Sequence, residues 1–264
     1  MVSRRTKSRQ EGIIMKQLLS IIMSLLIIAA VLSGCGGKVV GSGTTETTVK
    51  SEISTTAKST ETVSYEAKTT EALLSINDVP AQDLDAADAE YQEKKPVEGE
   101  EVAVVHTNYG DISVKFFPEV APKAVTNFKA LAKAGRYDNT IFHRITKLEK
   151  SGFAVVQGGD YTNFNGTGGV SAYGEGFGLE VSDYLRNLKG SLAMARSNSP
   201  DSNGSQFYFN ASENGAFDGN YTVFGQIYEG MDVLESISKV DTDSSDKPIE
   251  DVIVKNIEIV AYGK

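Results

Sequence analysis

The sequence predicts a mainly β domain built as a closed or nearly closed antiparallel barrel. Over residues 140–228, short apolar segments alternate with loops rich in Gly, Asn, Ser and Asp, and two stretches after residue 100 have helical periodicity. Many strands beside two helices favour a barrel over a parallel sheet, in which helices would alternate with strands. Residues 101–264 are enough for one domain with a single core.

Two strands and a helix open this domain. Residues 102–106 and 112–117 are rich in Val, Ile and Phe and flank the turn 108–111, which indicates a hairpin. Pro122 near the start and Gly135 just after the end delimit a helix over residues 121–134. Its buried stripe is expected to consist of Ala124, Val125, Phe128, Leu131 and Ala132.

The remaining elements follow in short steps. A second helix is expected over residues 231–239 and a closing strand over 251–260. Five further apolar segments between polar loops predict strands at 140–145, 153–157, 190–195, 206–210 and 222–228.

The amino-terminal residues 1–35 have the pattern of an export signal. Met15 and Lys16 precede an almost wholly apolar run over 18–32, which is short for a stable membrane span. The run ends in Leu-Ser-Gly before Cys35, which resembles the lipobox of bacterial lipoproteins, in which the cysteine is lipidated after cleavage. The alternative is a chance cysteine at the end of an uncleaved anchor. Either interpretation tethers the protein to a membrane from outside the cytoplasm, and Met15 is a candidate for the true start.

Residues 36–100 are expected to form a flexible tether. The first part, to about residue 72, consists largely of Thr, Ser, Gly, Glu and Lys and cannot bury enough apolar surface to become ordered. Residues 73–100 are acidic and could form a weak helix or a partner-binding peptide, but a linker with transient structure is favoured. Pro96 and Gly99 mark the boundary of the domain.

Composition excludes several functions. The net charge of −9 argues against nucleic-acid binding, which needs a basic surface. A single cysteine excludes an intramolecular disulfide, and the two histidines, His106 and His143, make a zinc site or a serine-histidine triad improbable. The glycines around 166–176 lack the context of a phosphate-binding loop. We expect no metal and no cofactor.

One arginine and two glutamines are the candidate chemical groups. Arg144, Gln157 and Gln206 each stand in a short strand-like motif, without an accompanying acid, base, thiol or metal cluster. Such a set can bind and polarise an amide, but it is poorly equipped to cut one.

Six motifs follow one another along the domain: Phe-His-Arg-Ile at 142–145, Gln-Gly-Gly-Asp at 157–160, Asn-Gly-Thr-Gly-Gly at 165–169, Leu-Ala-Met-Ala at 192–195, Asn-Gly-Ser-Gln-Phe at 203–207 and Val-Phe-Gly at 223–225. Their order and approximate spacing resemble those of the cyclophilins. The resemblance extends from about residue 102 to residue 262 and implies an eight-stranded barrel capped by two helices, peptidyl-prolyl cis-trans isomerase activity and proline-containing polypeptide clients. We expect a monomer.

Arg144 is the predicted catalytic residue. Amide resonance opposes rotation about an X–Pro bond, and a guanidinium near the prolyl nitrogen can stabilise its lone pair as resonance is lost. The alternative for Arg144 is an ordinary surface arginine in an ion pair. Gln157 and Gln206 are expected to orient Arg144 and to bind the peptide backbone, although they could instead satisfy polar groups at strand edges.

A set of mostly apolar residues is predicted to receive the proline ring and the adjoining substrate. The family pattern supports Tyr208 and Phe217 most directly, and the alternative for every member is a place in the core. The other members are Val155, Met194, Ala195, Tyr221 and Phe153.

The sequence departs from the family at three places. The connection from Arg144 to Gln157 is longer, because residues 146–151 look inserted, so that Phe153 lies one place before the pocket phenylalanine and Ala154 takes its slot. A bulge could restore Phe153 to the pocket. Ala216 replaces the tryptophan of cyclosporin-sensitive members, which predicts weak cyclosporin binding, and Tyr221 replaces a histidine.

Three functional hypotheses follow. The first is a membrane-tethered isomerase that assists the folding of exported proteins. The second is a peptide-binding or chaperone module that has lost turnover because of the altered loop after Arg144. In the third, the tether acts as a surface adhesin and the domain is only a scaffold.

Overall fold

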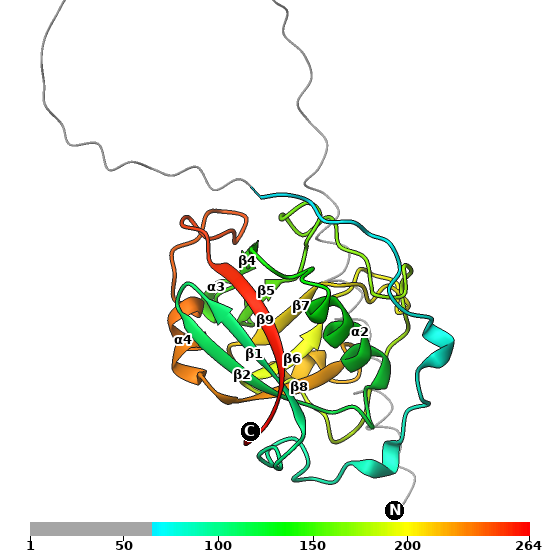
Figure 1. The fold of residues 1–264 in the computed structure, drawn as a ribbon. Helices are drawn as coiled ribbons and strands as arrows, with labels where there is room; N and C mark the ends of the chain where they lie inside the picture. Colours follow the sequence, from blue (N-terminus) through cyan, green and yellow to red (C-terminus); the bar gives the residue numbers. More distant parts are fainter. Residues whose placement is uncertain (1–64) are drawn as a thin grey trace, which may run out of the picture. The chain divides into compact units, whose positions relative to one another are not determined.

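The structure is a computed structural model that describes residues 65–264 (Figure 1). The predicted signal segment, Cys35 with its lipid, the choice of Met15 as the start and the first part of the tether lie outside the described residues. Among the helices of the described part, none has the length and apolar character needed to cross a membrane.

A single curled antiparallel sheet forms the body of the domain. Its nine strands follow the order β3-β9-β1-β2-β8-β6-β7-β5-β4. The mainly β fold class with an antiparallel sheet is therefore confirmed. The strands are β1 Glu101–Thr107, β2 Gly110–Phe116, β3 Thr140–Ile141, β4 Arg144–Ile145, β5 Val155–Gly158, β6 Ser191–Met194, β7 Phe207–Asn210, β8 Val223–Glu229 and β9 Ile253–Ala261.

The two end strands of the sheet are neighbours along the chain. The sequence predicts one strand over residues 140–145, but the structure divides it into β3 and β4, with Phe142 and His143 between them. Because only two residues separate the first and last strands of the sheet order, the sheet must curl round until its ends approach each other. This interruption explains nine strands where eight are expected.

Two helices are found where the sequence predicts them. They are α2, Pro122–Lys133, and α4, Met231–Ser238. The first turn of α2 has no side-chain cap of its own, and the buried carboxylate of Glu180 instead accepts hydrogen bonds from the backbone N–H groups of Lys123 and Ala124 at 3.0 and 2.9 Å. A third short helix, α3, Leu148–Ser151, lies in the inserted segment.

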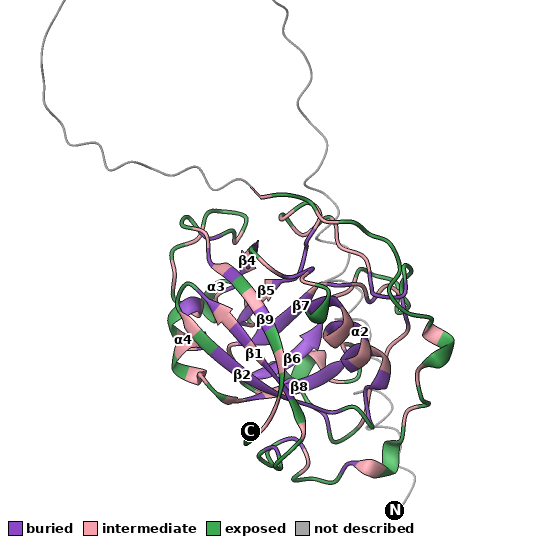
Figure 2. Ribbon diagram, viewed as in Figure 1, coloured by how far each residue is buried: buried purple, intermediate pink, exposed green. Residues whose placement is uncertain are grey.

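The buried apolar residues form two clusters. Figure 2 shows that buried residues are concentrated in the strands. The larger cluster fills the inside of the curled sheet and centres on the ring of Phe128 from α2. That ring lies between 5.2 and 5.8 Å from the rings of Phe116, Tyr137, Phe207 and Phe224. The smaller cluster includes Phe117, Val155, Ala193 and Tyr208.

Residues 65–100, which we call the strap, run along the outside of the domain (Figure 1). Backbone N–H groups of Lys68 and Asp83 donate to the carbonyls of Tyr161 and Glu119 at 3.2 and 2.8 Å, and Ala87 is buried. The structure thus differs from the flexible tether expected through residue 100. The regular elements of the strap are the short 3-10 turns Ile76–Asp78 and Leu84–Ala86. The contacts just named lie outside these turns, so no helical or strand periodicity reveals them.

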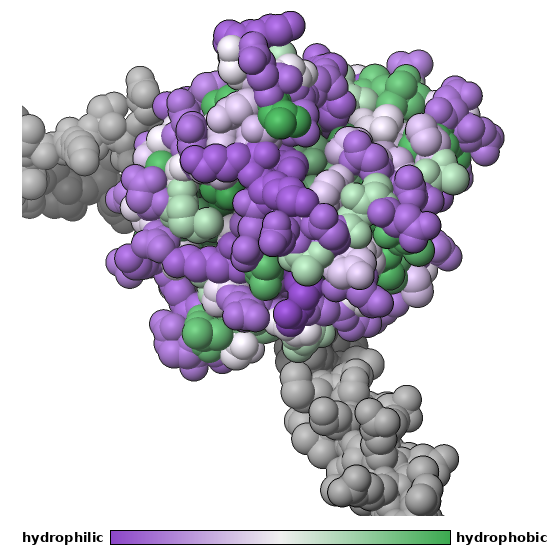
Figure 3. Space-filling view, turned by 90° about the horizontal axis from the view of Figure 1, so that it is seen from below, coloured by the Kyte–Doolittle hydropathy of each residue, from purple (hydrophilic) through white to green (hydrophobic). Residues whose placement is uncertain are grey.

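The surface between these elements is predominantly polar. In the view from below, hydrophilic residues cover most of the visible face and apolar residues are scattered among them (Figure 3). This distribution agrees with the polar loops predicted between the strands.

Candidate active site

Strand register brings the predicted site together on one face of the sheet. Arg144 of β4 pairs with Gln157 of β5, Gln157 pairs with Tyr208 of β7, and Tyr208 pairs with Ala193 of β6. Directly paired residues point to the same face of an antiparallel sheet. Four adjacent strands therefore place a guanidinium, an amide and an aromatic ring in one row.

The neighbouring row of the same strands points into the core. Ile145, Val156, Phe209 and Leu192 pair in the same sequence across the four strands, and all are fully buried in the larger cluster. Met194 pairs with Phe207 and is also fully buried there. The prediction that Met194 lines the pocket is therefore wrong, because its place in the alternation of β6 turns it inward.

The two glutamines are hydrogen bonded to each other. Gln157 Nε2 donates to Gln206 Oε1 at 3.0 Å, and Gln206 Nε2 donates to the carbonyls of Gly166 and Gly168 at 2.9 and 2.8 Å. Both amide hydrogens of Gln206 are thus used by the protein. Gln206 orients Gln157 and is less suited to binding a peptide than the sequence analysis expects.

Asp160 organises the loop that supplies those carbonyls. Its buried carboxylate accepts hydrogen bonds from the backbone N–H groups of Thr162, Asn163, Asn165, Gly166 and Gly168. Burial opposes ionisation of this carboxyl, but the backbone donors outweigh it and lower the pKa of Asp160. At Gly169, which has a φ of 85°, a Cβ atom would collide with the Ser205 hydroxyl, so the tight turn requires glycine.

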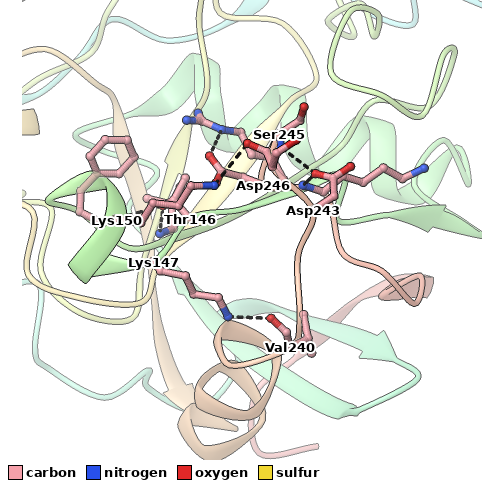
Figure 4. A network of polar contacts seen from close by, with 12 residues as sticks. Thr146, Lys147, Lys150, Val240, Asp243, Ser245 and Asp246 are labelled. Atoms are coloured by element: carbon pink, nitrogen blue, oxygen red, sulfur yellow. Dashed lines mark hydrogen bonds and ion pairs between the residues drawn. The ribbon is translucent and has the colours of Figure 1, made fainter.

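Arg144 is held from the side by Asp246. Its Nε lies 3.7 Å from Asp246 Oδ2, and the Lys150 ammonium of α3 lies 2.6 Å from Oδ1 of the same carboxylate. Figure 4 shows Lys150 and Asp246 in this network, together with Lys147, which donates to the carbonyl of Val240. The backbone N–H of Ile145 also donates to the Asp246 carbonyl at 2.8 Å.

The ion pair leaves the end of the guanidinium available. Arg144 has 42 % of its side chain exposed, and its guanidinium carbon lies 5.9 Å from the centre of the Phe153 ring. An ion pair with Asp246 at Nε and a chemical role for the exposed part of the guanidinium are therefore compatible.

Four aromatic rings pack together beside Arg144, where the sequence analysis expects the proline pocket. Phe217 is central to this group, with ring centres of Phe153, Tyr208 and Tyr221 at 5.1, 6.1 and 5.0 Å. The side chains of Val155 and Ala195 belong to the same apolar cluster. Apart from Met194, the residues predicted for the pocket lie together.

Phe153 reaches this pocket although it is displaced by one position in the sequence. The chain leaves α3 through Gly152 in the left-handed conformation, and Ala154 turns away, with its N–H donating to the Ser212 hydroxyl and its carbonyl accepting from Ala211. The extra residue is therefore accommodated before β5, and β5 keeps its register with β4 and β7.

The sequence analysis missed several residues of the site. Asp246, and Asn187, whose Oδ1 accepts a hydrogen bond from the Tyr208 hydroxyl at 2.9 Å, lie in loops without a motif. Their roles depend on contacts across the fold. A cavity of about 290 Å³ adjoins the two glutamines and is lined also by Ala195, Arg196 and Ser197. The position of Arg196 and Ser197 between Ala195 and the motif of Gln206 is the signal that could have identified them.

The histidines take no part in this arrangement. His143 is buried next to the motif arginine, and burial lowers its pKa to about 4, so the ring is neutral at physiological pH. His106 contacts Asp111 in the β1–β2 hairpin. Within residues 65–264 no group of three or more His, Cys, Asp or Glu residues could hold a metal ion.

The fold is a curled antiparallel sheet that places Arg144, Gln157 and Tyr208 in one row on one face, beside a cluster of aromatic rings. A family model described as cyclophilin type peptidyl-prolyl cis-trans isomerase/CLD matches residues 102–259. This chain belongs to the cyclophilin family.

Curated relatives and solved structures agree with this assignment. Peptidyl-prolyl cis-trans isomerase 9 of Schizosaccharomyces pombe is 42% identical over 158 residues, which cover 60% of this chain and 25% of that protein. Peptidyl-prolyl cis-trans isomerase-like 3 of Dictyostelium discoideum is also 42% identical, over 60% of this chain and 94% of that protein. A putative bifunctional phosphatase/peptidyl-prolyl cis-trans isomerase of Streptococcus pyogenes is 41% identical, and 38% of its length is covered.

A solved relative was crystallised with a proline dipeptide. It is the cyclophilin type isomerase of Cryptosporidium parvum in the presence of Ala-Pro, which matches with a TM-score of 0.57 and 38% identity over 61% of this chain and 99% of that chain. The chain spans only a quarter to two fifths of the length of several other relatives.

Proposed function

We propose that this protein catalyses cis-trans isomerisation of X–Pro peptide bonds, with Arg144 as the catalytic residue. The observation that supports this most strongly is the row formed by Arg144, Gln157 and Tyr208, which sets a guanidinium beside the aromatic cluster where the proline pocket is expected. Relatives that carry the isomerase name and the Ala-Pro dipeptide in the related crystal structure are consistent with it.

The proposed reaction requires rotation about an amide bond and no covalent chemistry. Its barrier of roughly 18–20 kcal/mol comes from resonance between the nitrogen lone pair and the carbonyl. When the bond twists, the lone pair localises on the prolyl nitrogen and can accept a hydrogen bond from Arg144. Each ~1.4 kcal/mol removed from the barrier raises the rate tenfold. A donor that binds only the twisted state therefore accelerates rotation.

The neighbours of Arg144 supply its geometry in this proposal. In this proposal Asp246 holds Arg144 at Nε, the terminal nitrogens donate to the substrate, and the rings of Phe153, Phe217 and Tyr208 hold the proline ring. Gln157 donates a side-chain N–H to Gln206. The side-chain oxygen of Gln157 is then available to accept a hydrogen bond from the substrate backbone. No general acid or base is needed.

A direct test compares wild type with Arg144→Ala and Arg144→Lys, using NMR exchange between the cis and trans forms of an X–Pro peptide. We expect Arg144→Ala to lower kcat/KM by about a hundredfold, since one aligned donor to a transition state is commonly worth that much. Arg144→Lys should recover little, because an ammonium lacks the planar fork and the Nε contact with Asp246.

The same experiment distinguishes the proposed isomerase from the rival function, a peptide-binding module without turnover. If wild type binds the peptide but does not accelerate exchange, and Arg144→Ala binds equally well, the protein is a peptide-binding module without turnover. Circular dichroism of each variant should match wild type, so that a loss of rate is not a loss of fold.

We further propose that the enzyme acts outside the cytoplasmic membrane on exported proteins, anchored by a lipid on Cys35. Support comes from the apolar run over 18–32 and the Leu-Ser-Gly-Cys sequence at 32–35. Labelled palmitate should be incorporated into wild type and absent from Cys35→Ser, which should leave the membrane fraction. Equal labelling of the two proteins would contradict the anchor.

A further inference from the structure

Gln92 of the strap is buried against the loop that precedes β6. Its Nε2 donates to the Arg186 carbonyl at 2.8 Å, and its Oε1 accepts from the Arg186 N–H at 2.9 Å. Nε2 also donates to Gln226 Oε1 on β8 at 3.1 Å. Only 3% of the surface of Gln92 is exposed, and the domain satisfies the polar groups of its side chain.

Asn187, the next residue of that loop, is hydrogen bonded to Tyr208 of the predicted proline pocket. Asn187 Oδ1 accepts a hydrogen bond from the hydroxyl of Tyr208 at 2.9 Å, and this contact is buried. Burial raises the pKa of Tyr208 well above its usual value, so the phenol keeps its proton and donates. Asn187 therefore fixes the position of an aromatic ring that the proposed function assigns to the substrate.

A second connection leads from the same loop to Phe217. The carboxylate of Asp218 accepts from the backbone N–H of Asn187 at 2.7 Å and from Arg186 Nε at 3.0 Å. Asp218 directly follows Phe217 at the end of the 3-10 turn Gly215–Phe217. Two of the pocket rings are thus attached to Arg186 and Asn187, the segment that Gln92 clamps.

Contacts on either side hold Gln92 in place. Ala87 is buried in the apolar cluster that contains Val155 and Tyr208. The ring of Tyr91 lies 5.2 Å from that of Phe117. Lys115 of β2 is buried, with its ammonium 5.2 Å from the Tyr91 ring centre and 3.3 Å from the Lys94 carbonyl.

We propose that the strap is a positioning element of the isomerase site, and that Gln92 sets the proline pocket through Arg186, Asn187 and Tyr208. The proposal rests on the isomerase function proposed above. A strap that only covers apolar surface would contribute to stability alone, whereas a positioning strap also governs how tightly proline is held.

Two strap glutamines provide a matched comparison in the full chain. Gln92→Met keeps the shape of the side chain but removes the clamp on Arg186. Gln82 likewise donates to a loop carbonyl, that of Val181 at 3.1 Å, and Val181 lies outside the Arg186–Asn187 segment that bonds to Tyr208 and Asp218. Gln82→Met therefore controls for the loss of one contact between strap and domain.

We expect Gln92→Met to raise the KM for an X–Pro peptide about threefold to tenfold with kcat nearly unchanged, the effect of one weakened hydrogen-bonded support. The ring signals of Tyr208 in tyrosine-labelled protein, assigned with Tyr208→Phe, should shift in Gln92→Met and stay in place in Gln82→Met. Both variants should lose some thermal stability.

The same measurements can overturn the proposal. If Gln92→Met lowers stability but leaves KM and the Tyr208 signals as they are in wild type, the strap is a cover and not a positioning element. If wild type shows no isomerase activity, the proposed function fails separately. The Tyr208 signals and the dissociation constant of the X–Pro peptide then still decide the role of Gln92.

Discussion

Asp246 lies between two cations, the Arg144 guanidinium at 3.7 Å and the Lys150 ammonium at 2.6 Å. Its side chain is 14% exposed, whereas Arg144 and Lys150 are 42% and 48% exposed. A mostly buried carboxylate therefore pairs with two more exposed cations. One of them belongs to the inserted helix α3, so the insertion is connected to the site residue that the family resemblance singles out.

Asp246→Asn should reduce turnover more than binding. Without the carboxylate, Arg144 loses its anchor at Nε and samples more rotamers, so we expect kcat to fall about fivefold to tenfold with KM little changed. Lys150→Gln is the matched control, since Asp246 can then pair with Arg144 alone, and its kcat should stay near that of wild type. Equal losses in the two variants would show that the insertion, and not Asp246, orients Arg144.

Phe153→Ala tests whether the displaced phenylalanine belongs to the pocket. It removes the ring that contacts Phe217 and lies near Arg144, so KM for an X–Pro peptide should rise about tenfold. Leu148→Ala, at an exposed position of α3, should leave KM as it is. Kinetics at saturating peptide would separate this binding effect from a change in kcat. An unaltered KM in Phe153→Ala would place the phenylalanine outside the pocket.

His143 makes the stability of the fold depend on pH. Its pKa is lowered to about 4 by burial, against 6.5 for an exposed histidine, so the unfolded chain binds the proton more readily between these values. Stability from this group is complete above pH 6.5 and is lost as the pH falls toward 4, by about 3 kcal/mol in total. Urea unfolding at several pH values should show this loss.

His143→Gln supplies the comparison for that measurement. It removes the titrating group, so the unfolding free energy should vary less between pH 6.5 and 4 than in wild type, whatever its absolute value. Parallel curves for the two proteins would rule out His143 as the source.

Asp160→Asn should loosen the loop behind the glutamine pair. The neutral amide cannot accept all the backbone hydrogen bonds that the carboxylate accepts, and its own N–H groups oppose the loop donors. We expect a loss of about 2 kcal/mol or more in unfolding free energy. Hydrogen exchange at Gly166 and Gly168 should accelerate, and unchanged protection there would contradict the role given to Asp160.

The parts of the fold that the sequence predicts are those with periodicity or strong end signals. Pro122 and Gly135 bracket α2 correctly, and the apolar alternation around the 108–111 turn gives the first hairpin. Phe142 and His143 could not be recognised as an interruption, since both are buried and read as part of one strand.

The residues of the site likewise fall into those that a local sequence pattern predicts and those that it does not. Arg144, Gln157, Gln206 and most of the pocket residues stand in motifs that can be read locally. Asp246 and Gln92 act through partners about a hundred residues away or in different loops, and no local pattern reports such contacts. Met194 shows the converse error, because its motif points to the site while the alternation of β6 turns it into the core.

The alternation of the two rows across β4, β5 and β7 also limits how this chain can change in length. One residue added within β5 would exchange Gln157 with a core position and move Val156 to the cleft, which would disrupt the site and the core together. The extra residue before Val155 has no such effect, because the turn at Gly152 and Ala154 absorbs it. Residues 146–154 are therefore a permissive site for insertions and deletions, whereas β5 requires a fixed number of residues.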